Sequence, residues 1–498
     1  MPCPYWCQAR GRAAIGSTGC VSSMAKDSHQ DTSLAFDALM GDPSGSLGRA
    51  LRAGQSFLAE ASTSELLAAV GRTIEAVPPA RCPDKRWFQK SFGRGPSDAP
   101  DDLLVGHGLF FLTEQRRLVL DCTAGHYQMT WGYGHPELRA LLLDGVERGI
   151  VWDNHSNIPA APVKRLSARL VELANPAACV DALRTDGDRL NTVLLGVCTG
   201  SVACAAALKI MLMHHARVKR DRGAPLFVAL EGNYHGTDFL AQRLRGRWRG
   251  CFTGVEVIEV QPNDGEELER VFERYGQRVA GFWAEPIMMN REAIRLAPSY
   301  LRLARRLCDE VGALMALDEI QTGFWFPEVL CTKRGGVEPD FIVLGKGMTA
   351  GFHPLAALLY RGRLDCLEQY DAISTNGNAA LAAYLALGCI ALIERNAERI
   401  GKVGAHFHSL MSELCAEFPH LLQGTRGEGH MTGLKFHQVE DAVGFQRCAL
   451  ERGLWVRVHA YHPGHSTVLT KFALPLDIEV AGYAVGAMRG LLKERPWA

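Results

Sequence analysis

The feature that most constrains the fold is a series of five short apolar runs, each followed at once by polar residues. Longer helix-like patterns alternate with these β-rich runs from Leu104 onward. This rhythm is typical of a parallel sheet covered by helices. The runs are "TVLLGVC" ending at Cys198, "PLFVAL" ending at Leu230, "VAGFWA" ending at Ala284, "ALMAL" ending at Leu317 and "FIVL" ending at Leu344.

The polar residues that follow these runs are expected to meet in one place. In an open α/β sheet the ligand crevice lies outside the carboxyl ends of the strands. The residues concerned are Ser201, Tyr234, Glu285, Asp318 and Lys346. Together they predict a site that uses a lysine, an acid, an aromatic ring and an anion hole of phosphate size.

Composition excludes several other classes of protein. The chain has 498 residues, of which 47% are hydrophobic and 22% charged, as in an ordinary soluble protein of two or three domains. Lys plus Arg equals Asp plus Glu at 54 each, so no net charge favours nucleic acid or an anionic membrane as a partner. No apolar run is long enough to span a bilayer.

The cysteines and the N-terminus predict a cytoplasmic protein. The 15 cysteines are scattered singly and include no C-x-x-C pair, which favours reduced thiols and gives no metal site. The first 26 residues contain no acidic residue and no apolar core, so they do not form a secretory signal. They fit a disordered leader, and Met24 is an alternative start.

Taken singly, each candidate residue has a simpler structural explanation. The turn at Gly200 and Ser201 either binds a phosphate at a helix N-terminus or only caps that helix. Asp318 either faces a protonated ring nitrogen or forms a salt bridge, and Lys346 is either a Schiff-base amine or an exposed turn lysine. Tyr234 either stacks on a flat ring or packs in the core, and core packing is the preferred interpretation for the neighbouring His235.

The combination favours one cofactor. A phosphate cup, a ring stacker, a pyridinium partner and a Schiff-base lysine, all at strand ends, describe pyridoxal 5′-phosphate. No single residue decides this interpretation.

At these residues the chain resembles the class III aminotransferases, which are pyridoxal-phosphate enzymes of fold type I. The resemblance runs from about Leu120 to about Leu474 and includes seven motifs in the family's order. The motifs are "LDCTAGHYQMTWGYGHPEL", "CTGSVACAAALK", "GNYHG", "WAEP", "LDEIQTGF", "LGKGMTAGFHPLAAL" and "STNGNAALAA".

The resemblance implies a fold and a domain plan. The fold is α/β, with a mostly parallel central sheet of seven strands, helices on both of its faces, and a smaller α+β domain from the N- and C-terminal segments. The expected parts are a partly irregular N-terminal extension at 1–103, the N-terminal segment of the small domain at 104–165, the large cofactor-binding domain at 166–385 and the C-terminal small domain at 386–498.

The resemblance also implies roles for the cofactor-binding residues. Lys346 would form the Schiff base and move a proton, while Asp318 would pair with the pyridine nitrogen. The remaining cofactor contacts would be Gly200 and Ser201 at the phosphate, Tyr234 on the ring, Glu285 after its strand and Gln321 near the ring hydroxyl.

Other carried-over roles concern a partner chain and the substrate. Ser374, or Thr375 if the register shifts by one, would reach the cofactor phosphate of a neighbouring subunit, which implies a homodimer with its sites at the interface. Tyr127 falls where the family places a pocket aromatic. Arg426 is either an anion contact or a surface residue.

The chain departs from the family where the family binds carboxylates. An arginine that often forks onto the substrate carboxylate is replaced by Lys471, which offers a point charge instead. Some relatives have a glutamate after the Glu-Pro segment that shields this arginine. In this chain the residue near that position is Asn290. These changes argue against ordinary turnover of glutamate or 2-oxoglutarate.

Three functions follow in order of preference. The first is a transaminase that forms an external aldimine with an amino acid or amine and transfers its amino group. The second is a lyase or carbon–carbon bond-forming enzyme on the same scaffold, which Lys471 favours modestly. A descendant without cofactor is disfavoured because Lys346 and Asp318 are both present.

Overall fold

A computed structural model describes residues 36–83, 101–150, 158–175, 180–219, 222–245, 255–459 and 462–497. The predicted leader with Met24 lies outside the described residues. The described helices before the central sheet are α2 (Ser46–Glu60), α3 (Thr63–Ala69), α4 (Ala124–Tyr127), α5 (Pro136–Glu147), α6 (Ala161–Ala174) and α7 (Val180–Leu183).

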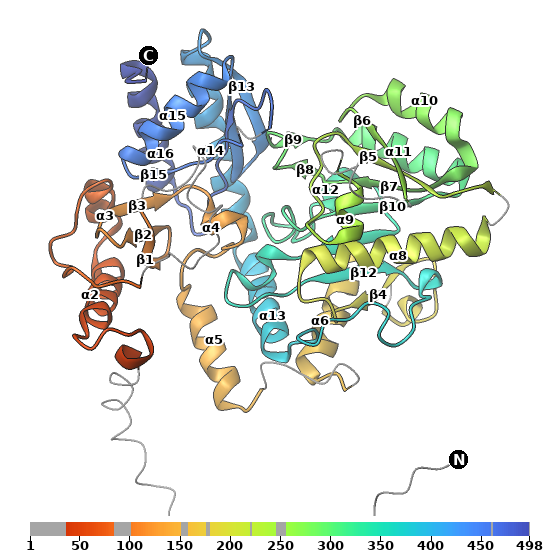
Figure 1. The fold of residues 1–498 in the computed structure, drawn as a ribbon, viewed down its shortest axis with the longest axis horizontal. Helices are drawn as coiled ribbons and strands as arrows, with labels where there is room; N and C mark the ends of the chain where they lie inside the picture. The colour runs from red at the N-terminus through yellow and green to blue at the C-terminus, as the bar shows by residue number, and fades with distance from the viewer. Residues whose placement is uncertain are drawn as a thin grey trace, which may run out of the picture.

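The centre of the molecule is a seven-stranded sheet with the order β4-β12-β11-β10-β7-β5-β6 (Figure 1). Its strands are parallel except β12, which runs antiparallel to both of its neighbours. The strands are β4 (Leu190–Leu194), β5 (Leu226–Leu230), β6 (Glu256–Val260), β7 (Val279–Ala284), β10 (Leu314–Asp318), β11 (Phe341–Leu344) and β12 (Ala357–Arg361). The predicted fold, a mostly parallel sheet of fold type I, is confirmed.

Helices cover both faces of this sheet because its strands are apolar on both sides. In β5, Phe227 and Ala229 pack into the core beside α8 (Gly200–Val218), while Val228 packs into the core beside α10 (Gly265–Tyr275) and α11 (Pro298–Val311). Two-sided burial is what a central parallel strand requires. The remaining elements of this part are α9 (Phe239–Arg243), α12 (Thr332–Gly335), β8 (Ile287–Met288), β9 (Ile294–Arg295) and the short 3₁₀ turns Gly276–Arg278, Lys346–Thr349 and Gly362–Leu364.

Two smaller sheets come from the two ends of the chain. In the first sheet, β15 (Leu454–Trp455) pairs in parallel with β3 (Leu118–Asp121), so the N- and C-terminal segments lie side by side (Figure 1). The other elements are β1 (Leu103–His107), β2 (Phe110–Thr113), β13 (Leu422–Glu428), β14 (Met431–Phe436), β16 (Thr467–Val468), α13 (Ala380–Arg395), α14 (Ala397–Glu417), α15 (Val439–Glu451) and α16 (Ile478–Glu494). The predicted domain boundaries stay a proposal.

The predicted strands end within one residue of the observed ones except for the first. The run "TVLLGVC" predicts a strand that reaches Cys198, but β4 ends at Leu194. The backbone beyond β4 turns to another partner, because Ser374 N donates to Gly196 O at 2.7 Å and Asn378 N donates to Leu195 O at 3.0 Å. The chain therefore leaves the sheet before it reaches α8.

Among the described helices, none alone is long and apolar enough to cross a membrane. The pair α13 and α14, bent by 72° at its break, passes the same test by length and composition only.

Candidate active site

A cavity of about 280 Å³ lies at the carboxyl ends of the central strands. It brings together residues from both ends of the chain and from the loops after β5 and β10. Its walls are formed by His126, Tyr127, Gly200, Ser201, Tyr234, Gly236, Asn290, Ile320, Gln321, Lys346 and His459. Six residues predicted from the sequence therefore line one cavity: Tyr127, Gly200, Ser201, Tyr234, Gln321 and Lys346.

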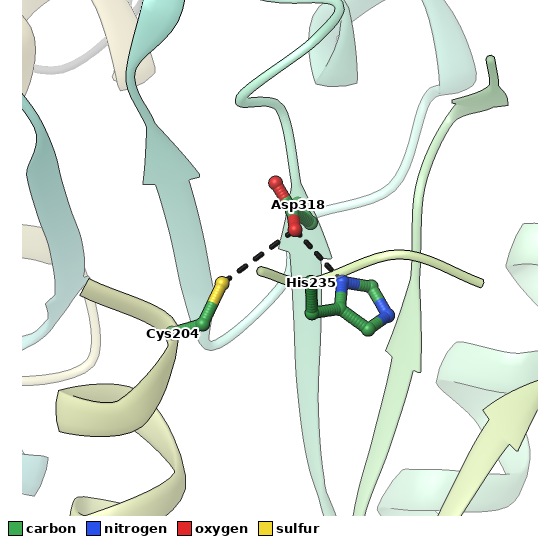
Figure 2. A group of neighbouring side chains, drawn as sticks. All are labelled: Cys204, His235 and Asp318. Carbon is green, nitrogen blue, oxygen red and sulfur yellow. Dashed lines mark hydrogen bonds and ion pairs between the residues drawn. The ribbon is translucent and has the colours of Figure 1, made fainter. Parts of the chain in front are cut away.

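Asp318, the last residue of β10, is held by donors from three elements (Figure 2). Its Oδ2 accepts a hydrogen bond from His235 Nδ1 at 2.7 Å and one from the Cys204 thiol at 3.6 Å. Its Oδ1 accepts the main-chain N–H of Ile320 at 2.9 Å. Asp318 is only 2% exposed, so water cannot solvate its carboxylate. These three hydrogen bonds compensate for the lost hydration.

His235 is therefore more than a core side chain. It is fully buried, as predicted, but its ring also orients the Asp318 carboxylate. Its Nε2 has no hydrogen-bond partner among the described residues.

The trio Cys204, His235 and Asp318 also has the donor types of a metal site. Its three ligand atoms lie within 4.8 Å of one another. The short bond between His235 and Asp318 identifies the trio as a hydrogen-bonded network, since it already uses the atoms that a metal would need. Burial and the Asp318 charge raise the pKa of the Cys204 thiol, which keeps it a thiol donor. The absence of a metal stays a prediction.

Lys346 comes after β11 and Gly345 and opens a 3₁₀ turn at φ 41°. Burial lowers the pKa of its amine, although the charges of Asp318 and Glu285 act in the opposite direction. Within the described chain its Nζ makes no hydrogen bond, so the amine is available to a ligand in the cavity. A partly desolvated lysine of this kind is suited to nucleophilic attack.

Gly347, the residue after Lys346, marks a close approach between loops. A Cβ there would lie 2.5 Å from Thr130 Oγ1, and its carbonyl accepts a hydrogen bond from that hydroxyl at 2.9 Å. The turn that carries Lys346 is therefore fixed against the N-terminal segment.

Two residues predicted to bind the cofactor, Glu285 and Gln321, each carry a buried polar atom without a partner among the described residues. Glu285 Oε1 accepts the main-chain N–H of Tyr234 at 2.8 Å, but Glu285 Oε2 and Gln321 Oε1 have no hydrogen-bond partner in the described part of the chain. Burial raises the pKa of Glu285 to about 7, with His235 acting against the increase. Such atoms are expected where a polar ligand completes a site.

The turn before α8 forms an open cradle. Thr199 occupies the N-cap position without a side-chain cap bond, and Ser201 Oγ instead accepts Thr237 N at 3.1 Å. Capping by Ser201, the alternative explanation of this turn, is therefore absent from the described contacts. A Cβ on Gly200 would lie 2.4 Å from Ile320, and one on Gly236 would lie 2.3 Å from Ser201 Oγ. Both glycines keep the backbone close to the cavity.

Lys471 lies beneath the cavity wall and does not line it. Its side chain is 0% exposed, and Nζ donates to Gln321 O at 2.6 Å and to Tyr127 O at 3.3 Å. Nζ also lies 4.1 Å from the centre of the Trp325 ring. Burial lowers the pKa of Lys471 well below its usual range, and the Lys346 charge lowers it further.

Asp318 and Glu285 do not line the cavity, and three other predicted residues also lie away from its walls. Arg426 is an exposed residue of β13. Ser374 and Thr375 lie in the loop before α13, where Thr375 is exposed. None of the three lines the cavity of this chain.

Two histidines at the cavity, and an arginine that bonds to one of them, were not predicted from the sequence. His126 and His459 line it, and Arg457 Nη1 donates to His126 Nδ1 at 2.9 Å. The histidine spacing in "RVHAYHPGH" was a visible signal, but no pattern in the sequence connects it to residue 126.

The residues present fit pyridoxal 5′-phosphate. The α8 cradle offers main-chain N–H groups to a phosphate, Tyr234 and Ile320 offer flat and apolar surfaces to a ring, and Asp318 offers a fixed carboxylate. Lys346 offers the amine. The fold and site thus define a pyridoxal-phosphate enzyme of fold type I.

Comparison with known proteins supports this assignment to the pyridoxal-phosphate enzymes. The family model "Aminotransferase class-III" matches residues 104–468, so the chain belongs to the class III aminotransferases. It is 26% identical over 405 residues to the ornithine aminotransferase of Emericella nidulans, covering 76% of this chain and 83% of that protein. It is 29% identical over 374 residues to the acetylornithine aminotransferase of Parasynechococcus marenigrum, covering 71% and 83%.

Solved structures share the fold. The ornithine aminotransferase of Toxoplasma gondii ME49 superposes with a TM-score of 0.70 at 23% identity, covering 83% of this chain and 94% of that one. A transaminase from the marine bacterium Virgibacillus gives a TM-score of 0.71 at 18% identity, with 82% and 97% covered. The predictions of the family, the cofactor and a pyridoxal-phosphate-dependent aminotransferase are confirmed. The names of these relatives give no support to the lyase alternative.

Proposed function

We propose that this protein transfers the amino group of an amino acid, using Lys346 and Asp318 as its two central residues. The observation that carries the proposal is the convergence of the Lys346 amine and the Asp318–His235 pair at adjacent strand ends. Ornithine and N-acetylornithine are the first amino-group donors to test, because the relatives described above are named as aminotransferases of these two compounds.

When bound, pyridoxal phosphate withdraws electrons from the substrate carbon that carries the amine and makes its proton acidic. The side chains of this protein support that chemistry in separate ways. Asp318, oriented by His235, is the residue that would hold the ring nitrogen of the cofactor. Lys346 Nζ, whose pKa burial lowers, supplies an amine that can take up and return a proton beside the cavity.

The test follows the absorbance of the purified holoenzyme while candidate amino acids are added one at a time, and identifies the products by mass spectrometry. We expect conversion of the cofactor to its amine form together with release of a carbonyl product. A product that forms without conversion of the cofactor would contradict transamination and favour the lyase alternative.

The active unit is a homodimer in which Ser374 or Thr375 of one copy reaches the cofactor phosphate of the other. Support comes from the position of both residues, since neither lines the cavity of its own chain. Two variants, Lys346→Ala and a double change Ser374→Asp with Thr375→Asp, are expected to be inactive alone. Mixed after mild unfolding, they should restore about a quarter of the sites, because each heterodimer keeps one intact site. A mixture that stays inactive would contradict a shared site.

A further inference from the structure

The cation that stands at the family's carboxylate-binding position is already engaged within the protein. Lys471 Nζ donates to two main-chain carbonyls and lies over the Trp325 ring, fully buried. If the Lys471 side chain turned into the cavity, it would lose both hydrogen bonds. A substrate carboxylate therefore requires a different cation.

Arg457 is a cation without a carboxylate partner. Its Nη1 donates to His126 Nδ1, while its buried Nε lacks a partner among the residues described. No carboxylate of the described chain lies within 4.0 Å of its guanidinium. Arg291, another arginine in this region, differs because it pairs with Glu231 at 3.4 Å. Arg457 does not itself line the cavity, but it bonds to His126, which does. An arginine with an unused donor next to a cavity residue is suited to an anion.

The hydrogen bond from Arg457 determines which nitrogen of His126 carries the proton. Arginine is always a donor, so His126 Nδ1 is the acceptor and the proton lies on Nε2. Burial, followed by the charge of Arg457, lowers the pKa of His126 to about 4, so the ring is neutral at pH 7. His126 lines the cavity and presents an N–H donor beside the guanidinium.

The turn that carries His126 is held in an unusual conformation. Ala124, Gly125, His126 and Tyr127 have φ of 47°, 64°, 66° and 67°, a left-handed turn in which non-glycine residues are strained by roughly 1 kcal/mol each. Asp121 holds it, because its Oδ2 accepts Gly125 N at 2.6 Å and its Oδ1 accepts Thr123 N at 2.8 Å. Strain maintained at a cavity wall is a mark of function.

We propose that Arg457 and His126 form the subsite that binds the carboxylate of the substrate. The proposal rests on the proposed aminotransferase function and assigns the residues that recognise the carboxylate of its amino-acid substrate. The guanidinium supplies the charge, and His126 Nε2–H supplies a second donor. Amines without a carboxylate leave both groups unpaired and bind more weakly.

Aminooxy compounds test the proposal without knowledge of the natural substrate, because they condense with the aldehyde group of the cofactor. Aminooxyacetate and its two next longer homologues are each compared with the O-alkylhydroxylamine in which a methyl group replaces the carboxylate. The saturation constant of each reaction is measured from the change in cofactor absorbance, for the wild-type holoenzyme and for Arg457→Met.

For at least one of the three aminooxy acids, Arg457→Met should raise the saturation constant by about tenfold or more. The paired O-alkylhydroxylamine should change by less than about twofold. The variant Arg457→Lys should recover part of the lost affinity, since lysine keeps the positive charge but cannot donate two parallel hydrogen bonds to a carboxylate. Exposed Arg447 on α15 is the matched control, and Arg447→Met should affect no probe. If Arg457→Met changed the saturation constants of each aminooxy acid and its O-alkylhydroxylamine equally, the proposed subsite would be rejected.

Calorimetric titration with butanoate keeps this test separate from the proposed function. A wild-type protein that reacts with no aminooxy compound would reject the aminotransferase assignment. Weaker binding of butanoate by Arg457→Met would support the carboxylate subsite even then. Equal binding by the wild type and the variant would reject the subsite.

Discussion

Two lysines lie near the same cavity, and burial lowers the pKa of both. Lys346 opens into the cavity, and its neighbours of opposite charge are Asp318 and Glu285. Lys471 lies behind the wall, where its partners are two main-chain carbonyls and an aromatic ring. The difference shows that burial alone does not make a lysine reactive, because reactivity also requires a free amine and access for a ligand.

The first and largest test removes the reactive lysine. Lys346→Ala should lower turnover by at least about a thousandfold and remove the link to the cofactor that borohydride reduction makes permanent. Mass spectrometry of the reduced protein measures the link. Lys471→Met is the matched comparison and should keep it. A reducible link in Lys346→Ala, or its loss in Lys471→Met, would reverse the roles of the two lysines.

A second test removes the negative charge near Lys346. Asp318→Asn should lower kcat by about a hundredfold or more, because the ring nitrogen loses the carboxylate that keeps it charged. Cys204→Ala removes only the longest of the three hydrogen bonds to Asp318 and should cost far less. Steady-state kinetics measures both variants. Equal losses would show that the thiol matters as much as the carboxylate.

A third test compares the structural contributions of the two lysines. Lys471→Ala should lower the free energy of unfolding of the cofactor-free protein by roughly 3 kcal/mol, since it empties a buried volume and leaves two carbonyls unpaired. Lys346→Ala should change it by less than about 1 kcal/mol, since its amine makes no hydrogen bond to the described residues. Denaturant unfolding measures both, and the opposite ranking would contradict the assignment of Lys471 as structural.

The smallest effect concerns pH. Because the folded pKa of Lys471 lies below the ordinary value of 10.5, the unfolded chain binds more protons between these two values. Stability should therefore rise with pH in that window, by up to about 1.4 kcal/mol per pH unit for this one group. Lys471→Met should flatten the rise when unfolding is repeated across a pH series. An unchanged slope would show that Lys471 stays protonated.

Much of the site could be predicted because it follows from strand ends. Tyr234, Asp318 and Lys346 come from local runs whose carboxyl ends are recognisable in the sequence. The parallel sheet then brings them together, whatever lies between them along the chain.

The rest could not be predicted because it depends on packing between distant segments. Nothing local indicates that Lys471 turns inward to main-chain carbonyls, since an apolar stretch with one lysine is equally consistent with a cation at the cavity. The early end of β4 depends on Ser374 and Asn378, which bond to residues 195 and 196. The contact between His126 and Arg457 joins residues 331 positions apart.

That long separation has a consequence for how the enzyme is made. Arg457 follows β15, which pairs with β3 next to the residue that holds the His126 turn. A ribosome completes Lys346, Asp318 and the phosphate cradle well before it reaches this strand. An unfinished chain therefore contains the reactive residues before it contains Arg457. The residues proposed to select among amines are therefore completed after the reactive ones.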